Sequence, residues 1–396
     1  MRSWPLILRR SFAQYHNNVH KLEPTKGDRV VVAMSGGVDS SVVAKMLSEK
    51  DYDLSAIFMR NWDTRDESGT DEGCEWKKDW HDVQQVCKML DIPCKLVDLS
   101  KEYWNRVFQP ALAIWEMGGT PNPDLWCNRE VKFGALMQHL TSADTWFATG
   151  HYARKDWCMK QSPPRPKLMR SVDSVKDQTY FLASIPESSL ARSIFPLAPY
   201  VKDEVKQMAR EWGLPTAARE ESMGLCFVGE KRRFDTFLSQ YLPPKPGAIV
   251  DLRGKQVGEH QGLWSFTIGQ NARLKGQPQK MFVSDKDYNR NQIIVVPGRE
   301  HKALYCMGLV AFNWQWIWAD SPPPLRNGFK ARAKLRYRME DIPCTLYRTA
   351  DESHIRIMFE NDPQQAIAAG QSVVVWDGDW CLGCGIIQKT IPLPES

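Results

Sequence analysis

The segment Ala33–Ser41, with the sequence AMSGGVDSS, combines the residue types that bind a phosphate group. Its glycine pair, Gly36 and Gly37, permits a tight turn whose backbone N–H groups converge on an anion. Serine hydroxyls on both sides of the pair supply further hydrogen-bond donors. The segment lacks the lysine of a Walker A loop, which argues against kinase-like chemistry. We therefore interpret it as a pyrophosphate-binding loop, in which Asp39 either holds Mg²⁺ or caps the loop.

Cys127 and Cys226 lie in segments that suit reactive thiols. Cys127 follows the proline-rich turn GGTPNPDLW and precedes a helix that we expect to begin near Asn128. A thiol at a helix N-terminus beside Arg129 has a lowered pKa and is a competent nucleophile. Cys226 precedes the basic run Lys231–Arg233, which also makes its surroundings electropositive. For either cysteine alone, a small buried hydrophobic residue is the alternative interpretation.

The chain contains 10 cysteines at irregular spacing, too few for a disulfide scaffold. This predicts reduced thiols in a reducing compartment. The pair Cys381 and Cys384, in the sequence CLGC, has the C-x-x-C spacing of two of the ligands of a zinc or cluster site. No second C-x-x-C or histidine pair accompanies it, so we interpret the pair as structural and predict no metal ligands. An iron–sulfur cluster formed by three cysteines that converge in space is the alternative.

Strands and helices alternate around the glycine-rich loop. Val30–Ala33 is an apolar run typical of a buried strand, and apolar side chains recur at helical spacing after the turn. The alternation predicts an α/β fold with a doubly wound parallel sheet, whose ligands bind at the carboxyl ends of the strands. The further expected elements are strands at Leu54–Met59, Cys94–Leu99 and Thr145–Thr149, helices at Trp80–Leu90 and Glu102–Met117, a loop at Gln161–Lys167 and helical structure over Leu190–Gly213.

Short β-rich runs replace the helical patterns from Pro243 onward. We predict a leader over residues 1–24, an ATP-binding catalytic domain over 25–220, a small central domain over 221–298 that carries Cys226, and a C-terminal all-β barrel over 299–396. The tryptophans of WQWIW, Trp314, Trp316 and Trp318, share one face of a strand, where barrel core is a simpler use than base stacking.

The segment Phe329–Arg338, FKARAKLRYR, alternates apolar and basic residues. We expect a single strand with one wholly basic face, which repels itself unless an anion covers it. The chain's formal net charge is +5, and this clustering predicts contacts to nucleic-acid phosphates. A solvated strand whose lysines prevent edge pairing is the alternative.

The N-terminus carries Arg2, Arg9 and Arg10 but no acidic residue before Glu23. In a helix, its apolar side chains form a stripe opposite these arginines. This pattern predicts a mitochondrial presequence and a location in the matrix, with a disordered basic tail as the alternative. No stretch approaches the apolar length of a membrane span, so we expect no membrane partner.

The glycine-rich segment resembles the PP-loop of the ATP pyrophosphatases, whose fold is of the adenine nucleotide alpha hydrolase type. Taken together, the ordered segments of the chain resemble the tRNA-specific 2-thiouridylases, and the likeness covers nearly all of the chain after the leader. The segments that carry it are AMSGGVDSS, FMRNWD, TPNPDLWCN, ATGHYAR, KDQTYFL, GLCFVGE, GEHQGLWSFTIGQ, RYRMEDIPC and GQSVVVWDGDWCLG. The glycine-rich insertion that bacterial relatives carry after TIGQ is replaced here by NARLKGQPQKMF.

The resemblance implies a reaction in which ATP and Mg²⁺ adenylate the C2 oxygen of the wobble uridine, U34, before sulfur replaces it with release of AMP. Cys226 resembles the residue that carries the persulfide, and Cys127 resembles the second thiol, which releases sulfide or resolves the carrier as a disulfide. Asp124 resembles the acid proposed for proton transfer. The implied ATP contacts are Ala33, Met34, Ser35, Gly36, Gly37, Val38, Asp39, Ser40, Met59 and Gly150.

The resemblance also implies a tRNA partner, namely the mitochondrial tRNAs for lysine, glutamate and glutamine, and a protein that donates persulfide sulfur. The implied tRNA contacts are Asn122, Pro123, Asp124, His151, Lys176, Asp177, Gln178, Arg336, Tyr337 and Gln371. Two alternative functions remain open. Neither of them requires the full set of both cysteines and both partners. One is a PP-loop ligase or amidotransferase of the GMP- or NAD-synthetase type acting on a small molecule, and the other is a non-catalytic RNA-binding protein.

Overall fold

The computed structural model describes residues 21–62, 75–140, 144–220, 234–351 and 353–394. The chain forms two compact units that do not follow chain order. Unit 1 comprises Met1–Pro110, Arg129–Asp177 and Ile185–Glu221. Unit 2 comprises Ala111–Asn128, Gln178–Ser184 and Ser222–Ser396. The sequence-based domain boundaries stay a prediction, and no helix in the described ranges is long and apolar enough to cross a membrane.

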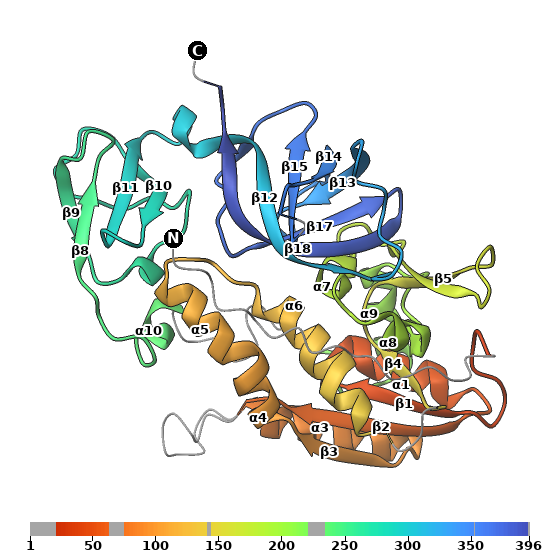
Figure 1. Cartoon of the computed structure of the whole chain (residues 1–396). Coiled ribbons are helices and arrows are strands. Elements are labelled where there is room, and N and C mark those ends of the chain that lie inside the picture. The colour runs from red at the N-terminus through yellow and green to blue at the C-terminus, as the bar shows by residue number, and fades with distance from the viewer. Residues whose placement is uncertain (1–20, 63–74, 141–143, 221–233, 352, 395–396) are drawn as a thin grey trace. The chain divides into compact units, whose positions relative to one another are not determined.

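Unit 1 is built on a five-stranded sheet with the order β3-β2-β1-β4-β7. All neighbouring pairs are parallel, which confirms the predicted α/β fold (Figure 1). Val30, Val31 and Val32 of β1 are all buried, because both faces of a doubly wound sheet are covered by helices. The strands are β1 (Arg29–Met34), β2 (Asp53–Arg60), β3 (Cys94–Asp98), β4 (Trp146–Thr149) and β7 (Ser193–Ile194).

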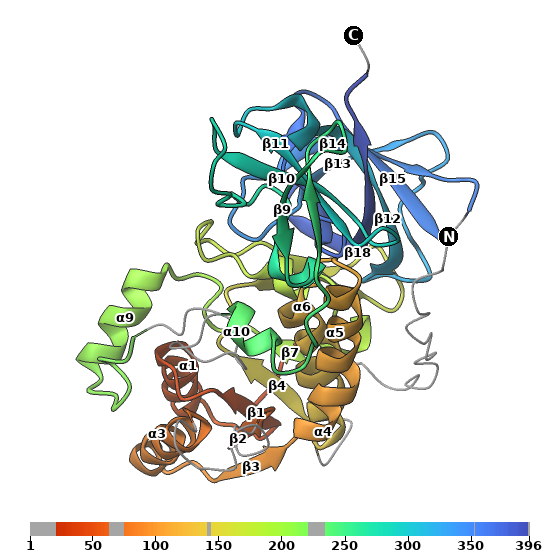
Figure 2. The same cartoon turned by 90° about the vertical axis from the view of Figure 1, so that its left-hand side faces the viewer.

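Helices cover both faces of this sheet. Helices α1 (Val38–Ser48), α3 (Glu75–Leu90) and α9 (Lys202–Glu211) share one apolar cluster with Trp146 and Ala148 of β4. Figure 2 shows these three helices on one side of the sheet and α4 on the other. On the second face, the ring of Phe147 contacts that of Phe133 at 5.6 Å between centroids. The other helices of unit 1 are α4 (Ser100–Tyr103), the π-helices Trp104–Phe108 and Asn128–Leu136, and α8 (Glu187–Ala191). Helix α5 (Gln109–Glu116) belongs to unit 2 from Ala111 onward.

Two sequence-based expectations for unit 1 are wrong. The predicted loop Gln161–Lys167 includes the start of a strand, β6 (Arg165–Met169), which pairs antiparallel with β5 (Arg154–Cys158). The expected helical stretch Leu190–Gly213 is interrupted, because β7 adds Ser193 and Ile194 to the sheet beside β4. Pairing with a buried strand outweighs local helical periodicity at these positions.

Unit 2 contains a four-stranded sheet and a barrel, as expected for the central and C-terminal regions. The sheet has the order β10-β11-β8-β9, and its core includes Ile249, Val283 and Val295. Its strands are β8 (Gly247–Val250), β9 (Gln256–His260), β10 (Met281–Asp287) and β11 (Gln292–Pro297). Short helices accompany it: α10 (Phe234–Leu238), the 3₁₀-helix Leu263–Ser265 and the 3₁₀-helix Lys302–Leu304. Helices α6 (Pro123–Cys127) and α7 (Thr179–Leu182) also belong to unit 2.

The C-terminal strands close into a barrel, because β12 pairs antiparallel with both β15 and β18. Antiparallel pairs β15–β14, β14–β13, β13–β17 and β17–β18 complete the circuit. Trp314 and Trp316 pack against its apolar core, as predicted. The strands are β12 (Tyr305–Trp316), β13 (Phe329–Lys334), β14 (Ile342–Arg348), β15 (His354–Phe359), β16 (Gln364–Gln365), β17 (Ser372–Asp377) and β18 (Trp380–Pro392).

The prediction of one basic strand over Phe329–Arg338 is wrong. Strand β13 ends at Lys334, and Arg336 lies beyond it in a turn. Lys334 is buried, at 8% exposure, and its ammonium lies 6.0 Å from the centre of the Trp376 ring. A cation held over an aromatic face is not available to a phosphate, so the basic face is interrupted.

Candidate functional site

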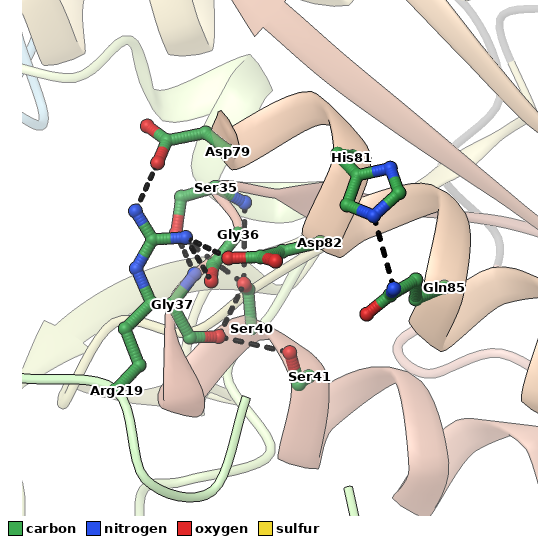
Figure 3. A network of polar contacts seen from close by, with 10 residues as sticks. All are labelled: Ser35, Gly36, Gly37, Ser40, Ser41, Asp79, His81, Asp82, Gln85 and Arg219. Carbon is green, nitrogen blue, oxygen red and sulfur yellow. Dashed lines mark hydrogen bonds and ion pairs between the residues drawn. The ribbon is translucent and has the colours of Figure 1, made fainter. Parts of the chain in front are cut away.

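The glycine-rich loop joins β1 to α1 at the carboxyl edge of the sheet (Figure 3). Gly36 has a φ of +77°, and a Cβ atom at this position would lie 2.8 Å from the backbone oxygen of Asp79. Both the left-handed backbone and the close approach of α3 therefore require glycine here. Gly37 is the N-cap of α1 and offers no side-chain cap, so the first N–H groups of the helix face a ligand site.

The serine hydroxyls hold the loop in shape. Ser40 Oγ accepts a hydrogen bond from the Ser35 backbone N–H at 3.2 Å and donates to the Gly37 oxygen at 3.1 Å. Ser41 Oγ donates to the same oxygen at 2.9 Å. These bonds hold the loop in one shape, which favours the binding of an anion. The Ser35 side chain is exposed, and its Oγ accepts a hydrogen bond from the Gly37 N–H at 3.4 Å and lies 3.3 Å from Ser40 Oγ.

The predicted ATP contacts outside the loop lie at the same edge of the sheet. Met59 is near the end of β2, whose residue Phe58 pairs with Met34 in β1. Gly150 directly follows β4, and a Cβ atom there would lie 3.0 Å from the Ser40 nitrogen. The structure thus brings the predicted set Ala33–Ser40, Met59 and Gly150 together. That these residues bind ATP stays a prediction.

Asp39 is engaged by two partners that the sequence analysis missed. Lys202, at the first turn of α9, places its ammonium 2.6 and 2.8 Å from the two carboxylate oxygens of Asp39. Tyr152 donates its hydroxyl hydrogen bond to the same carboxylate at 3.1 Å. Asp39 therefore joins α1 to α9 rather than capping the loop. A lysine that opens a helix far along the chain gives no local sequence signal of this pairing.

A second ion cluster flanks the loop. Arg219 donates hydrogen bonds to Asp79 and Asp82 of α3, and to the Gly36 oxygen at 3.1 Å (Figure 3). The two carboxylates neutralise a guanidinium that would otherwise raise the positive potential of the loop. Sequence reasoning missed all three side chains, because they become neighbours only when α3 packs on the loop.

The fit of this region to Mg²⁺ can be tested from the carboxylates present. No group of three or more metal-ligating side chains occurs in the part of the chain that the structure describes. Both oxygens of Asp39 contact Lys202, and Asp79 and Asp82 contact Arg219. Mg²⁺ is commonly bound through one or two carboxylates together with substrate phosphates. The residues therefore make no metal site of their own, and they fit a cation that arrives bound to ATP.

His151, a predicted tRNA contact, is buried at 9% exposure. Its Nδ1 lies 2.8 Å from Thr149 Oγ1, and its ring lies 5.9 Å from that of Phe133. Burial lowers the pKa of His151 well below its usual value, and the nearby Lys132 charge lowers it further. The imidazole is therefore neutral at pH 7, and it lies buried beneath the surface of the protein.

Asp177, a second predicted tRNA contact, is also buried, at 2% exposure. Its carboxylate accepts hydrogen bonds from Arg170 and from the Ser171 backbone. Neighbouring Lys176 is half-buried and donates its backbone N–H to Asp173. The Asp177 side chain thus holds this turn together, whereas Lys176 lies nearer the surface.

In unit 2, Cys127 and Asp124 lie on the short helix α6. Asn122 is the N-cap of this helix and accepts a hydrogen bond from the Leu125 N–H at 3.3 Å. Pro123 follows at the first helical position, where a missing N–H costs nothing. A π-helix does begin at Asn128, as predicted, but it directly continues α6, so Cys127 does not occupy a helix N-terminus. Its side chain is buried, at 5% exposure.

Helix α7 links α6 to the barrel. Asn128, next to Cys127, donates a side-chain hydrogen bond to the Phe181 oxygen at 3.1 Å. The Tyr180 hydroxyl donates to the Ser372 oxygen at 2.9 Å. Burial raises the pKa of Tyr180, while its hydrogen bond with Asn122 acts in the opposite direction. Tyr180 is therefore a neutral phenol that connects the cap of α6 with β17.

Several predicted tRNA contacts gather at this helix. The Tyr337 ring lies 4.4 Å from the Phe181 ring, measured between centroids. Arg336 is exposed and donates to the Gln365 oxygen at 3.1 Å. Gln371 directly precedes Ser372 in β17, and Gln178 is the N-cap of α7. The structure thus brings Asn122–Asp124, Gln178, Arg336–Tyr337 and Gln371 into one region of unit 2.

The structure describes only one of the two predicted catalytic cysteines, Cys127. Cys226 lies outside the described residues, so its predicted partnership with Cys127 stays a prediction. Cys381 and Cys384 are buried in β18, at 0% and 4% exposure. No group of three or more metal-ligating side chains occurs within the described ranges, and the structural role of this pair stays a prediction.

Comparisons with known proteins cover almost the whole chain. Residues 28–230 match the profile of the tRNA methyl transferase HUP domain, and residues 235–297 match that of the tRNA methyl transferase PRC-barrel domain. Residues 307–387 match the Aminomethyltransferase beta-barrel domain. These profiles agree with the sheet of unit 1 and with the central sheet and closed barrel of unit 2.

Curated relatives match over their full length. The tRNA-specific 2-thiouridylase MnmA of Vibrio vulnificus (strain CMCP6) is 41% identical over 379 residues, which is 93% of this chain and 98% of the relative. The protein of that name from Alkaliphilus oremlandii is 42% identical over 371 residues, 92% of this chain and 98% of the relative. The profile names refer to methyl transfer, but whole-length identity of this size decides the relationship. The chain belongs to the tRNA-specific 2-thiouridylase family.

Proposed function

We propose that this chain is an ATP-dependent tRNA-uridine 2-sulfurtransferase that thiolates the wobble uridine of mitochondrial tRNAs. The observation that carries the proposal is the hydrogen-bonded loop Ser35–Ser41, in a chain that matches named 2-thiouridylases over 92–93% of its length. The lysine, glutamate and glutamine tRNAs are the proposed substrates.

In the first step, the loop binds the phosphates of ATP. The N–H groups at the start of α1 stabilise the negative charge that develops as pyrophosphate leaves. Mg²⁺ bound to ATP supplies further charge neutralisation. Lys202 fixes the Asp39 carboxylate between α1 and α9, which keeps it from repelling the phosphates. The AMP group then activates the C2 oxygen of uridine, which is otherwise a poor leaving group.

In the second step, the terminal sulfur of a Cys226 persulfide forms a bond to C2 of the uridine. The bond from C2 to the adenylated oxygen breaks, and AMP leaves. The Cys127 thiolate then attacks the Cys226 sulfur, so that the persulfide S–S bond breaks and a Cys127–Cys226 disulfide forms. A dithiol reductant restores the two thiols. In a second route, Cys127 attacks the persulfide first and releases sulfide as the nucleophile.

Asp124 is the proposed acid for proton transfer in this reaction. It lies in the first turn of α6, three residues before Cys127, and the Asn122 cap fixes the start of that helix. A carboxylate and a thiol on successive turns face the same side of a short helix. Both groups therefore approach one bound base together.

The proposed activity is tested with unmodified tRNA transcript, ATP and sulfide, followed by electrophoresis on a mercury-containing gel. The wild-type chain is expected to retard the tRNA that has the proposed wobble uridine, and a transcript with cytidine at that position is the control. With a persulfide donor in place of sulfide, Cys226→Ser is expected to abolish thiolation. Thiolation that survives this change would remove the carrier role of Cys226.

The mitochondrial location rests on the basic, acid-free segment before Glu23. Fusion of residues 1–24 to a fluorescent protein is expected to direct it to mitochondria. The same segment with Arg2, Arg9 and Arg10 changed to glutamate is the control, because import requires the basic face. A cytosolic signal from the unaltered fusion would contradict the proposed location and leave the enzymatic proposal intact.

The small-molecule ligase of the GMP- or NAD-synthetase type is the competing function, because it also uses ATP. Pyrophosphate release from ATP separates the two. The proposed sulfurtransferase releases pyrophosphate only when uridine-containing tRNA is present. Release that depends on a small amide-forming substrate and is indifferent to RNA would favour the ligase.

A further inference from the structure

A pocket of about 290 Å³ lies in unit 2, outside the residues discussed so far. Its wall includes Phe266, Thr267 and Gln270, from the segment GLWSFTIGQ, and Gly119 and Thr120, which lead into α6. The volume is near the lower limit for ligand pockets, so the site suits one planar group.

The pocket has aromatic walls. Trp115, Phe234, Trp264 and Phe266 line it, and the rings of Trp115 and Phe234 meet edge to face at 5.4 Å between centroids. Aromatic side chains of this kind provide stacking surfaces for bases, and every base has a face to stack. None of the residues that line the pocket is charged. The lining therefore favours a neutral planar group over a phosphate.

Polar groups of the pocket are available to such a group. Gln270 Oε1 accepts a hydrogen bond from the Thr267 N–H at 2.9 Å, which directs the amide nitrogen away from that turn. Within the described residues, neither this nitrogen nor the hydroxyls of Thr120 and Thr267 has a hydrogen-bond partner. An amide and hydroxyls beside aromatic rings are the combination that reads the edge of an unstacked base.

The pocket is held close to α6. Lys286 donates to the Gly118 oxygen at 2.7 Å, and the Thr120 N–H donates to the Ala369 oxygen at 2.9 Å. A Cβ atom at Gly370 would lie 2.7 Å from the Thr120 nitrogen, so the segment that leads into β17 packs directly against Thr120. Thr120 precedes Asp124 by four positions, which limits the distance between their Cα atoms to about 14 Å.

We propose that this pocket binds the base of a nucleotide adjacent to the target uridine in the anticodon loop. The inference rests on the proposed function, because it assumes that the tRNA presents its uridine at α6. The adjacent base would stack on Phe266 and accept a hydrogen bond from Gln270. The pocket thereby contributes to the choice of tRNA without touching the reacting atoms.

The test measures tRNA affinity with full-length tRNAs assembled by ligation, either intact or with an abasic nucleotide on one side of the target uridine. The wild-type chain is expected to bind one of the two abasic tRNAs about tenfold more weakly, as the loss of one stacked base predicts. Phe266→Leu keeps apolar volume but removes the aromatic face. Gln270→Leu removes the amide donor of an exposed side chain, together with the acceptor of the Thr267 N–H.

Both variants are expected to bind intact tRNA more weakly and to lose much of the difference between intact and abasic tRNA. Gln256→Leu, an exposed glutamine of β9 outside the pocket, is the matched control and is expected to behave as the wild type. Equal wild-type affinity for all three tRNAs, or an abasic penalty unchanged in both variants, would overturn the pocket assignment. If the wild type still thiolates intact tRNA in that case, the proposed function stands.

Discussion

Gly36 is the residue on which the shape of the nucleotide loop depends most directly. Gly36→Ala is expected to destabilise the protein by about 1–2 kcal/mol for the left-handed backbone alone. The added Cβ also meets the Asp79 backbone, so the loop must shift. We expect ATP-dependent pyrophosphate release to fall by about a hundredfold, since a small displacement of a positioning group has effects of that size.

Gly254→Ala provides the matched control for this change. Gly254 has a φ of +80°, but nothing lies within 4 Å of the position that a Cβ atom would occupy. Its substitution is expected to cost a similar free energy of unfolding, measured by urea denaturation, and to leave pyrophosphate release unchanged. Equal activity losses in the two variants would show that global stability, and not the loop, limits the reaction.

Lys202 neutralises Asp39 beside the phosphate site. Lys202→Met leaves that carboxylate without its cation, and we expect an increase of at least tenfold in the KM for ATP, because an unpaired negative charge faces the phosphates. The double variant Lys202→Met/Asp39→Asn removes both charges and is expected to recover part of the loss. Steady-state kinetics at several ATP concentrations measures the effect. A double variant with a KM no lower than that of the single variant would contradict this account.

At the scale of single elements, β13 shows that a pattern in the sequence does not determine which charges are exposed. Lys330 is exposed, whereas Lys334 is buried against Trp376. Arg332 pairs with Asp341. Alternation correctly indicated a strand, but the strand ends at Lys334, and Arg336 and Arg338 lie in the bend and turn that follow it. The end of the strand depends on its pairing with β14 and β17, which no local pattern encodes.

Lys330 and Lys334 therefore respond differently to the loss of charge. Lys330→Gln is expected to leave the unfolding free energy within about 0.5 kcal/mol and, if the strand contacts phosphate, to lower the salt dependence of tRNA binding by about one charge. Lys334→Gln is expected to destabilise the barrel by about 1–2 kcal/mol, because it removes a cation over an aromatic ring in a buried place. Urea denaturation and binding at several salt concentrations test both statements. A loss of stability in Lys330→Gln but not in Lys334→Gln would contradict them.

The elements around the glycine-rich loop were predictable because several local signals agreed. A β-branched run, a glycine pair and a helical repeat located β1, the loop and α1 within a few residues. In contrast, the partners of the loop come from α3, α9 and Arg219. These contacts arise from tertiary packing, and neither charge nor periodicity in the sequence distinguishes the buried Lys202 from the other lysines.

At the scale of the whole molecule, Lys286 couples protonation to global stability. Burial lowers the pKa of Lys286 to about 7, from an unfolded value near 10.4. Between about pH 7 and 10 the unfolded chain carries a proton that the folded chain lacks, so the free energy of unfolding rises with pH in this window. The contribution is at most about 1.4 kcal/mol per pH unit.

Lys286→Met is expected to remove this contribution to the pH dependence. Urea denaturation from pH 6 to 10 of the wild type and the variant isolates it as the difference between their two slopes. The variant is also expected to be more stable than the wild type near pH 6, where the folded protein must bury a charge. Parallel pH profiles for the two proteins would rule out the buried lysine as the cause.

Helix α7 has a consequence for how the protein can be divided. Tyr180 and Thr179 form hydrogen bonds with Ser372 and Trp376, which belong to the last strands of the chain. The short helix α6, which carries Cys127, is thus supported through α7 by residues that are synthesised after those of the unit 1 sheet. A nascent or shortened chain can form the five-stranded sheet of unit 1 earlier. Helix α6 gains its support from α7 and β17 only when the barrel has closed.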